Sequence, residues 1–274
     1  MALSDEQAER KLAGQEWTAH NIRLSAQVTT MPGKPDFMET DTRLHSILQT
    51  LALFYRQGLK DLRVADLACL EGGFALAMAQ RGMDVVGIEA RQTNLDKALI
   101  LKEHFELPNL EFRRDDVKNF TRETYGTFDI VLALGILYHL DEPIKWMRQL
   151  AAATRGLLIV DSHFAPSLKD SLKLLDKDFA LGRLEQLKDG GTTYEGRWFQ
   201  DCSDAMDREK QVWSSYSNNQ SFWLTKESLC WGLIRAGFDV VFEQHPLGDP
   251  EILKFFSTTR ARGMFVAVKT GAFS

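Results

Sequence analysis

The sequence predicts an α/β fold with a doubly wound, mostly parallel sheet of seven strands, helices on both faces of the sheet, and an inserted cap. Short runs rich in Val, Ile and Leu alternate with helical stretches from residue 60 onward, a pattern typical of parallel sheets covered by helices. This alternation stops over residues 163–224 and then resumes, which indicates an insertion. The length of 274 residues suits one large α/β domain that carries such an elaboration.

From residue 42 onward, each element of this fold has a matching stretch of sequence. The apolar residues of 42–59 recur at helical spacing, which predicts an amphipathic helix before the first strand. Strands and helices then alternate, with strands at 64–68, 84–89, 110–113, 128–134 and 156–162 and helices at 74–80, 92–105 and 142–152. Another helix begins after Thr225, its N-cap, and ends at Gly237. The last strands, 238–245 and 263–270, need not be parallel because the connection between them is short.

These boundaries divide the chain into three parts. Residues 1–59 are expected to form an N-terminal helical segment that serves as a lid. Residues 60–162 and 225–274 form the core, and residues 163–224 form a cap that contributes to a substrate pocket.

The composition excludes several classes of protein. With 33 Lys and Arg against 38 Asp and Glu, the net charge is −5, so the chain as a whole does not attract nucleic acid or an anionic membrane. No apolar run approaches the roughly 20 residues of a membrane span, and the N-terminus lacks a signal region. Three widely spaced cysteines argue against a disulfide framework and a zinc site. We therefore expect a cytoplasmic protein that binds no membrane.

Acidic residues follow three of the predicted strands, at the sheet edge where such folds bind ligands. Asp66 and Glu71 lie in the loop that leads through Gly72 into a helix, and two carboxylates suit a cationic ligand better than a diphosphate. Glu89, about 20 residues further on, is placed to accept both hydroxyls of a ribose. Asp116 is favoured over Asp115 as acceptor for an exocyclic amine, with the other aspartate capping the turn. A ribose, an amine-bearing base and a positive centre without phosphate together describe S-adenosyl-L-methionine.

At these motifs, VADLACLEGG, VVGIE, RRDDV and FDIVLALGILYHL, the sequence resembles the class I S-adenosylmethionine-dependent methyltransferases. The resemblance covers residues 60–162 and, more weakly, 225–270, and it implies a Rossmann-like fold. It also implies a role for each matching position. Asp66, Glu71 and the loop from Ala68 to Gly72 would hold the methionine part, Glu89 the ribose, Asp116 and Val117 the adenine, and Leu134 and Tyr138 the region of the sulfonium.

The first loop departs from the family's D-x-G-x-G-x-G pattern, because Ala68 and Leu70 stand where glycines are usual. Leu70 therefore requires a backbone conformation that a side chain tolerates. The stretch GILYHLDEP also resembles the bacterial enzymes that carboxymethylate a wobble uridine in tRNA.

Two histidines are candidates for a general base, because each follows the carboxyl end of a central strand. His163 is the preferred base and His139 the second choice, although many methyltransferases need only positioning. A divalent metal on Asp161, His163 and Glu195 is a less favoured alternative, since no compact ligand spacing supports it.

The acceptor pocket is expected to combine flat aromatic walls with a few polar anchors, namely Glu195, Arg197, Trp198 and Trp223. Such walls favour a planar or partly apolar acceptor, of which an aromatic molecule is one kind. By analogy with the N-terminal segments of this fold, Trp17, His20 and Asn21 are expected to close the cofactor side.

These observations favour a methyltransferase that acts on an oxygen or nitrogen of a small molecule. One alternative is a tRNA-modifying enzyme, which the net charge of −5 disfavours. Another is a protein that binds S-adenosylmethionine without catalysis, because of the altered loop. The sequence leaves the oligomeric state open, with a homodimer as one option.

Overall fold

The computed structural model describes residues 3–167, 180–245 and 261–273. The chain forms two compact units, Met1–Val117 and Lys118–Ser274, and each is described here by itself. Its main sheet has seven strands in the order β3-β2-β1-β4-β5-β10-β9, and a second sheet has the order β6-β7-β8. The predicted α/β fold class is confirmed.

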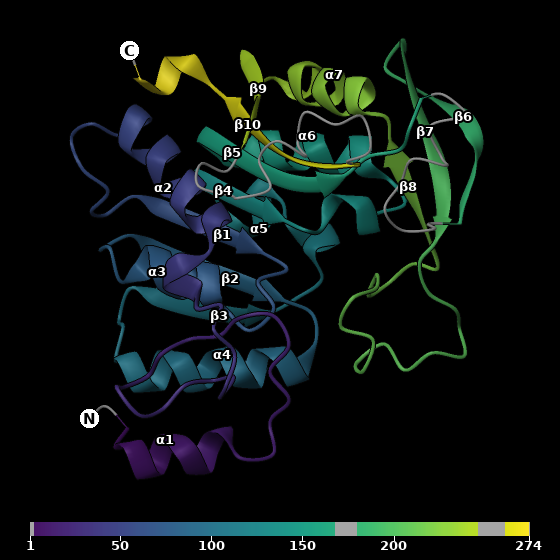
Figure 1. Cartoon of the computed structure of the whole chain (residues 1–274). Coiled ribbons are helices and arrows are strands. Elements are labelled where there is room, and N and C mark those ends of the chain that lie inside the picture. The colour runs from purple at the N-terminus through teal and green to yellow at the C-terminus, as the bar shows by residue number, and fades with distance from the viewer. Residues whose placement is uncertain (1–2, 168–179, 246–260, 274) are drawn as a thin grey trace. The chain divides into compact units, whose positions relative to one another are not determined.

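The first unit is a parallel three-stranded part of the main sheet with helices packed on it. Its elements are α1 (Asp5–Leu12), η1 (Met38–Thr40), α2 (Thr42–Phe54), β1 (Arg63–Leu67), α3 (Gly73–Ala79), β2 (Asp84–Glu89), α4 (Gln92–Phe105) and β3 (Leu110–Arg114). Strand β2 pairs in parallel with β1 on one side and β3 on the other. Helix α4 packs against β3, and α1 packs against α4 (Figure 1).

Small residues bring the β1–α3 turn close to the sheet. The ring of Phe112, on β3, occupies the space that side chains at Gly72 and Gly87 would need, with ring atoms 2.6 Å from an ideal Cβ at each. Gly72 also has a φ of 79°, so this position suits glycine for two reasons. The carboxyl ends of β1 and β2 are thereby held next to the start of α3.

The second unit combines the rest of the main sheet with the second sheet. Its elements are α5 (Arg122–Tyr125), β4 (Phe128–Leu134), η3 (Leu137–His139), α6 (Pro143–Ala153), β5 (Thr154–His163), β6 (Leu181–Asp189), β7 (Thr192–Gln200), β8 (Gln220–Leu224), α7 (Lys226–Ala236), β9 (Val240–Gln244), β10 (Arg262–Val268) and η5 (Thr270–Phe273), and η2 (Val117–Asn119) spans the junction. Strands β4 and β5 are parallel, whereas β10 is antiparallel to both β5 and β9. The last two strands are thus an antiparallel pair, as their short connection allowed.

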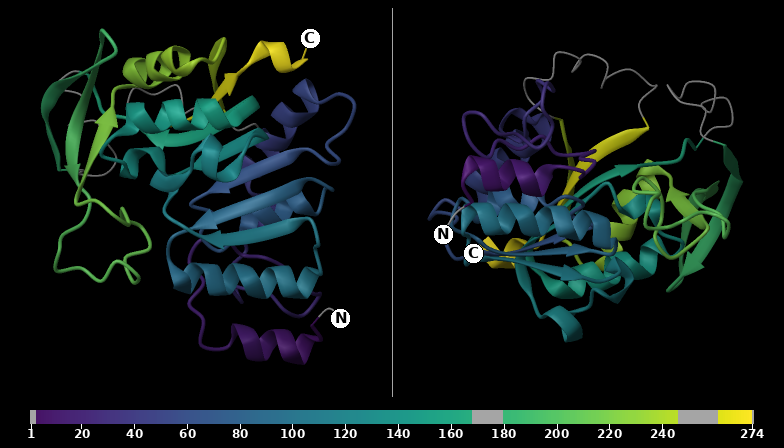
Figure 2. Two further views of the ribbon diagram at one scale, coloured as in Figure 1. Left: turned by 180° about the vertical axis from the view of Figure 1, so that it is seen from behind. Right: turned by 90° about the horizontal axis from the view of Figure 1, so that it is seen from below.

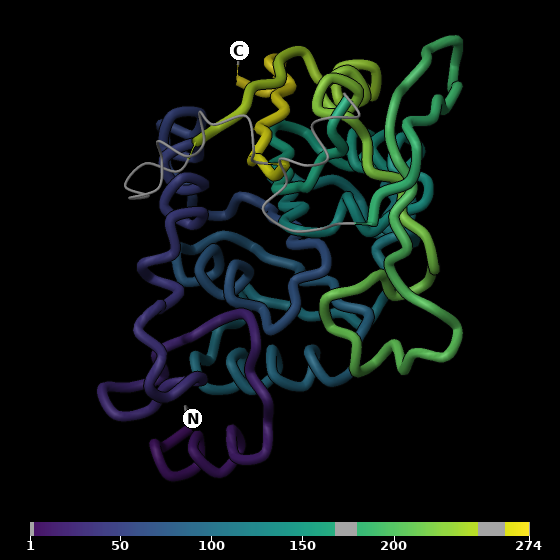
Figure 3. The backbone as a smooth tube through the Cα atoms, turned by 45° about the vertical axis from the view of Figure 1, so that its right-hand side comes forward, coloured from purple at the N-terminus to yellow at the C-terminus, as the bar shows by residue number. Residues whose placement is uncertain are grey.

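The second sheet lies within the predicted cap. Strands β6 and β7 form a hairpin whose two-residue turn, Gly190 and Gly191, has positive φ at both positions, as a tight hairpin requires. At the hairpin tip Arg148 pairs with Asp189. Residues 201–219 connect β7 to β8 without helix or strand, and Figures 2 and 3 show this long connection. The division of the chain into lid, core and cap stays a prediction.

Among the described residues, no helix is long and apolar enough to cross a membrane.

Candidate functional site

The loop after β1 has a backbone conformation that is typical of a glycine-rich turn, although Ala68 and Leu70 stand at two positions where glycine is usual. Ala68 and Leu70 have φ values of 53° and 51°, in the left-handed region that side chains rarely adopt. The N–H of Cys69 donates to the carbonyl of Ile88, at 3.0 Å, which ties the loop to β2. Leu70 therefore adopts the left-handed conformation, and its side chain is accommodated there, as the sequence predicted that this position would require.

Glu89 ends β2 and is 2% exposed. Its Oε2 accepts the N–H of Leu70 at 3.0 Å, and its Oε1 accepts the N–H of Arg91 at 2.9 Å. Burial raises the pKa of Glu89, and these backbone hydrogen bonds act in the opposite direction. Its Oε1 also lies 3.5 Å from Nδ2 of Asn94, so about one of the roughly four acceptor positions of this carboxylate remains for a ligand such as a ribose hydroxyl.

Asp66 is buried and has no counterion among the residues that the structure describes. It accepts the backbone N–H of Ala75 in α3, while its buried Oδ2 has no hydrogen-bond partner within the same described part of the chain. Burial raises its pKa to about 7, and the nearby charge of Glu89 adds to this. A site with an unsatisfied acceptor and an excess of negative charge fits a cationic cofactor.

At the end of β3 the two aspartates have different roles. Asp115 accepts the N–H of Asp116 at 2.8 Å and so caps the turn, which agrees with the preference for Asp116 as the adenine contact. Val117 is buried, as expected for a residue that frames a base.

In the second unit, the end of β4 leads into a tight turn and the helical turn η3. Leu134 is the last residue of β4, and Gly135 follows with a φ of 82°. The N–H of Gly135 donates to the carbonyl of Asp161, at 2.8 Å, so the turn is anchored on β5. Tyr138 then lies under the guanidinium of Arg262, 5.7 Å from its ring centroid.

His139, also on η3, is paired with a carboxylate from the long connection. Its Nδ1 is 2.6 Å from Oδ2 of Asp201, which also accepts the hydroxyl of Ser221 at 2.6 Å. The side chain of Asp201 is 2% exposed and that of His139 12%. Because a carboxylate oxygen accepts, Nδ1 carries the proton and the lone pair is on Nε2.

His163 has a different environment, although it also follows a strand. Its Nδ1 donates to the carbonyl of Ala261 at 3.1 Å, and its ring stacks on Trp223 at 5.1 Å and 14°. Burial, together with the positive charge of Arg262, lowers its pKa to about 4. His163 is therefore neutral near pH 7 and is a weak base there.

Asp161 forms a two-point ion pair with Arg262, with its oxygens 3.0 Å from Nε and 2.8 Å from Nη2. This pairing does not support the alternative in which Asp161, His163 and Glu195 hold a metal. Among the residues that the structure describes, no cluster of three or more His, Cys, Asp or Glu could hold an ion.

The comparisons with known proteins identify the family. A family model described as a methyltransferase domain matches residues 38–243, which is most of the chain. The chain belongs to this methyltransferase family. Its cofactor is S-adenosylmethionine.

The individual curated relatives match only part of this methyltransferase. A ubiquinone biosynthesis O-methyltransferase of Acinetobacter baylyi (strain ATCC 33305 / BD413 / ADP1) is 34% identical over 86 residues, 31% of this chain and 36% of the relative. A 23S rRNA uracil methyltransferase of Shewanella sp. (strain W3-18-1) is 25% identical over 54% of this chain and 33% of the relative. The chain thus spans about a third of the length of these curated relatives.

Two solved structures share the fold along most of this methyltransferase. The N-terminal domain of EvdMO1, with S-adenosylhomocysteine bound, aligns with a TM-score of 0.70 at 22% identity, over 97% of this chain and 96% of that one. Magnesium protoporphyrin IX methyltransferase of Synechocystis PCC 6803 aligns with a TM-score of 0.51 at 16% identity, over 87% and 90%. At these identities the likeness concerns the fold alone.

Of the four expected acceptor residues of the methyltransferase, only Trp223 belongs to the cluster around His163. Its ring contacts those of His163, Tyr138 and Phe199. Glu195 instead accepts from Gln186 on the neighbouring strand, at 3.3 Å, and Trp198 packs edge-on against Phe222.

Arg197 is not an anchor for the acceptor but a structural residue. It is 3% exposed, and its guanidinium donates to the carbonyls of Pro166 at 2.9 Å and Gly182 at 3.0 Å. The expectation failed because the sequence does not show that these carbonyls meet β7.

Glu71 also differs from the expectation of a cofactor contact. Its carboxylate is fully buried and is engaged by backbone N–H groups of residues 18–20 and by Lys97. Nearby, the side chain of Asn21 is occupied by the backbone of Lys34 and Met31. Residues that were expected to form a movable lid are thus hydrogen-bonded within the first unit.

The structure also places two residues beside His139 and Tyr138 that the sequence interpretation missed, namely Asp201 and Arg262. Asp201 lies in an irregular connection, where no strand-end rule applies, and it accepts a hydrogen bond from Ser221. Arg262 is the first residue of β10. The one sequence signal that could have indicated its role was its position next to the expected strand 263–270.

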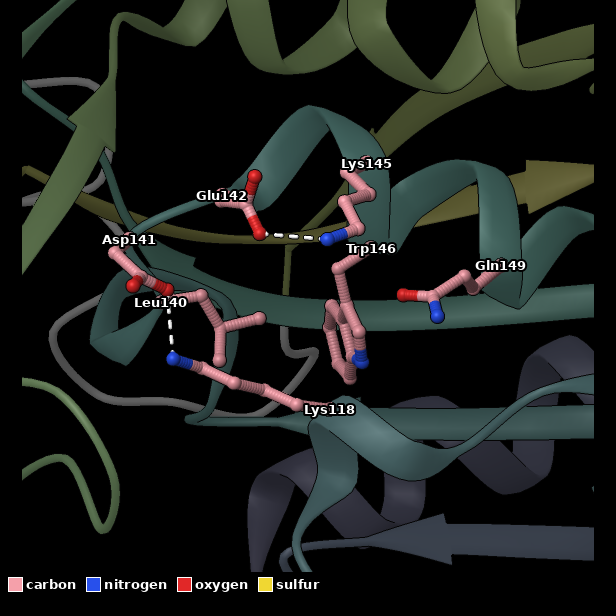
Figure 4. Close-up of a pocket in the computed structure, with 7 residues that line it drawn as sticks. All are labelled: Lys118, Leu140, Asp141, Glu142, Lys145, Trp146 and Gln149. Carbon is pink, nitrogen blue, oxygen red and sulfur yellow. Dashed lines mark hydrogen bonds and ion pairs between the residues drawn. The ribbon is translucent and has the colours of Figure 1, made fainter.

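A surface pocket of the second unit is separate from this cluster. It is lined by Lys118, Leu140, Asp141, Glu142, Lys145, Trp146 and Gln149 (Figure 4). Its charged groups pair with each other, Lys118 with Asp141 at 2.7 Å and Lys145 with Glu142 at 2.8 Å. Because these charged groups already pair with one another, the pocket does not indicate a particular class of ligand.

We expect Asp66→Asn to remove a pH dependence of stability. Because burial raises the pKa of Asp66 from its ordinary value of 3.8 to about 7 in the folded protein, the unfolded chain releases this proton first as the pH rises. The free energy of unfolding of the wild type should therefore fall, relative to Asp66→Asn, between about pH 4 and pH 7 and then level off. Urea denaturation across this range measures it, with the exposed Asp84→Asn as control. A difference that is independent of pH would contradict the assignment.

We expect Arg197→Met to lower stability without affecting the site. The loss of two hydrogen bonds from a buried guanidinium should reduce the free energy of unfolding by about 1–3 kcal/mol. The exposed Arg183→Met on β6 is the matched control and should be close to neutral. Chemical denaturation and calorimetry with S-adenosylhomocysteine separate the two roles. Normal stability with a raised KM for the acceptor would instead restore Arg197 to the acceptor site.

Proposed function

We propose that this methyltransferase transfers the methyl group to an oxygen or nitrogen of a small-molecule acceptor, with His139 as general base. The observation that carries the proposal is the 2.6 Å contact between His139 and the buried carboxylate of Asp201. Relatives named for ubiquinone biosynthesis and for magnesium protoporphyrin IX support a small acceptor, as does a solved relative studied in the presence of D-fucose.

For the cofactor, we propose the residues at the carboxyl ends of the first four strands. Asp66 and the backbone of Ala68–Gly72 would bind the methionine part, and Glu89 would accept a hydrogen bond from the ribose. Asp116 and Val117 would frame the adenine, and Leu134 and Tyr138 would lie near the sulfonium. The fit to a cation rests on Asp66, whose buried Oδ2 has no partner.

S-adenosylmethionine supplies an electrophilic methyl group on a sulfonium. The residues of this chain then have to bind the acceptor, orient it and take up its proton. Nε2 of His139 would accept the proton that the hydroxyl or amine of the acceptor gives up when its oxygen or nitrogen is methylated. The carboxylate of Asp201 holds the tautomer with the proton on Nδ1 and stabilises the imidazolium that forms.

Asp201 is itself fixed in place by the second unit. Its N–H donates to the carbonyl of Asn219 at 2.9 Å, and Ser221 donates to its carboxylate. Asn218 donates to the carbonyl of His139 at 3.1 Å, so the end of the long connection is tied to η3. These hydrogen bonds hold Asp201 and His139 in the positions that their own hydrogen bond requires.

His163 fits better as part of the acceptor wall than as the base. Its pKa of about 4 makes it a poor proton acceptor near neutral pH, and its stacking on Trp223 gives a flat surface with Tyr138 at a right angle. Such a surface suits a planar or partly apolar acceptor.

We expect His139→Ala to lower kcat by about 10²–10⁴-fold, the usual contribution of a general base. Asp201→Asn should lower kcat by a smaller factor, because the imidazole remains but loses its orientation. Both variants should bind S-adenosylhomocysteine as the wild type does. The measurement is S-adenosylhomocysteine formation with the low-molecular-weight fraction of a cell extract.

The exposed His45, which bonds the carbonyl of Glu39, gives the matched control His45→Ala with unchanged rate. Full activity of His139→Ala, or a larger kcat loss in His163→Ala than in His139→Ala, would refute His139 as the base.

A test of the acceptor class uses bulk tRNA and rRNA. Since the net charge is −5, we expect no binding that weakens steeply with added salt. A binding assay at low and at physiological salt measures this, with a basic RNA-binding protein as positive control. Tight, salt-sensitive binding, together with methylation of RNA, would favour the relationship to RNA methyltransferases over a small acceptor.

A further inference from the structure

Glu71 binds the backbone of a segment more than fifty residues earlier in the chain. Its Oε1 accepts the N–H of Thr18 at 2.6 Å, and its Oε2 accepts the N–H groups of Ala19 at 3.0 Å and His20 at 2.9 Å. Three consecutive N–H groups thus converge on one carboxylate. We call residues 16–20, held in this way, the clamp segment.

Lys97 completes this arrangement from α4. Its Nζ lies 3.3 Å from Oε1 of Glu71 and also donates to the carbonyl of Glu16. The side chains of Glu71 and Lys97 are 0% and 6% exposed. The charge of the carboxylate is compensated without solvent, so Glu71 is a fixed part of the first unit and not an open ligand contact.

A second connection joins the clamp segment to the start of α3, directly after the loop. The N–H of Gly73, the first residue of α3, donates to Nδ1 of His20 at 3.2 Å. The imidazole also fills the space at Gly73, since an ideal Cβ there would lie 2.6 Å from the ring. Burial lowers the pKa of His20 to about 4, which keeps the ring neutral and able to accept.

Both connections, at Glu71 and Gly73, directly follow the strained part of the loop in the chain. Ala68 and Leu70 are left-handed, although neither is glycine, and Leu70 N–H reaches Glu89. A backbone of this kind persists only where its surroundings hold it. Glu71 is adjacent to Leu70, and its side chain is immobilised by the clamp segment.

We propose that Glu71 is a positioning residue, which with the clamp segment holds Ala68 and Leu70 in the left-handed conformations that the cofactor loop requires. The proposal rests on the proposed assignment of this loop to the cofactor. It explains why a sequence without the usual glycines keeps the backbone of a glycine-rich turn.

The test is a double-mutant cycle between Glu71 and the strained position. In the wild-type background, Glu71→Gln should weaken binding of S-adenosylhomocysteine at least tenfold, because an amide keeps only one of the two accepting oxygens and leaves the charge of Lys97 uncompensated. In a Leu70→Gly background, the same change should weaken binding less than threefold, because glycine adopts the left-handed conformation without strain. Calorimetry on all four proteins measures this coupling.

The matched control is Glu103→Gln. Glu103 pairs with Lys11 and so also joins an N-terminal helix to α4, but this exposed pair does not involve the loop. Its loss should leave binding unchanged. Equal loss in the two backgrounds, or wild-type affinity in Glu71→Gln, would overturn the proposal.

Hydrogen–deuterium exchange of the wild type provides a test that does not need a variant to fold. The amides of residues 18–20 and of Leu70 and Gly73 should open as one cooperative unit, whether or not ligand is present. Exchange of the two segments with independent opening energies would also overturn the proposal. If the wild type binds no S-adenosylhomocysteine while the segments open together, the cofactor assignment fails and the structural role of Glu71 stands.

Discussion

Buried carboxylates are the constraint on which the first unit depends. Asp66, Glu71 and Glu89 are each at most 2% exposed, and a buried charge is costly unless it is paired or hydrogen-bonded. Glu71 has Lys97 and a row of N–H groups, and Glu89 has two backbone N–H groups. Asp66 has one backbone partner and a pKa raised to about 7. Glu71 and Glu89 are thus held by hydrogen-bond donors of the first unit, and in the proposed function Asp66 is the carboxyl group that binds the cationic cofactor.

In the second unit, neighbouring charges separate two histidines that look equivalent in sequence. His139 forms a hydrogen bond with the carboxylate of Asp201. Burial and the positive charge of Arg262 lower the pKa of His163, whose ring stacks on Trp223. Asp161, which pairs with Arg262, acts in the opposite direction on the pKa of His163 and offsets this lowering only in part. The two histidines thus differ in their surroundings, and in the proposed function one is the base and the other a part of the acceptor wall.

The sequence predicted what depends on periodicity and on strand ends. The order of strands and helices, the antiparallel pair at the end of the sheet, and the placement of Asp66, Glu89 and Asp116 all follow local patterns. Residues whose role depends on a distant partner could not be predicted. The donors to Glu71 are main-chain groups, which leave no signal in side-chain identity, and Asp201 lies in a connection without regular structure. Arg197 was misassigned for the same reason, because its partners are carbonyls of other segments.

Because Ala68 and Leu70 stand where glycines are usual, the conformation of this loop depends in part on contacts with distant residues. A left-handed residue with a side chain costs about 1–2 kcal/mol, so Ala68 and Leu70 together cost roughly 2–4 kcal/mol. A hydrogen bond to a charged group contributes about 1.5–3 kcal/mol, and Glu71 and Glu89 accept several within or beside the loop. These bonds can offset the strain, but only while the N-terminal segment is in place. The loop of this methyltransferase is consequently formed by residues far apart in the chain, whereas a glycine-rich turn can form from its own sequence.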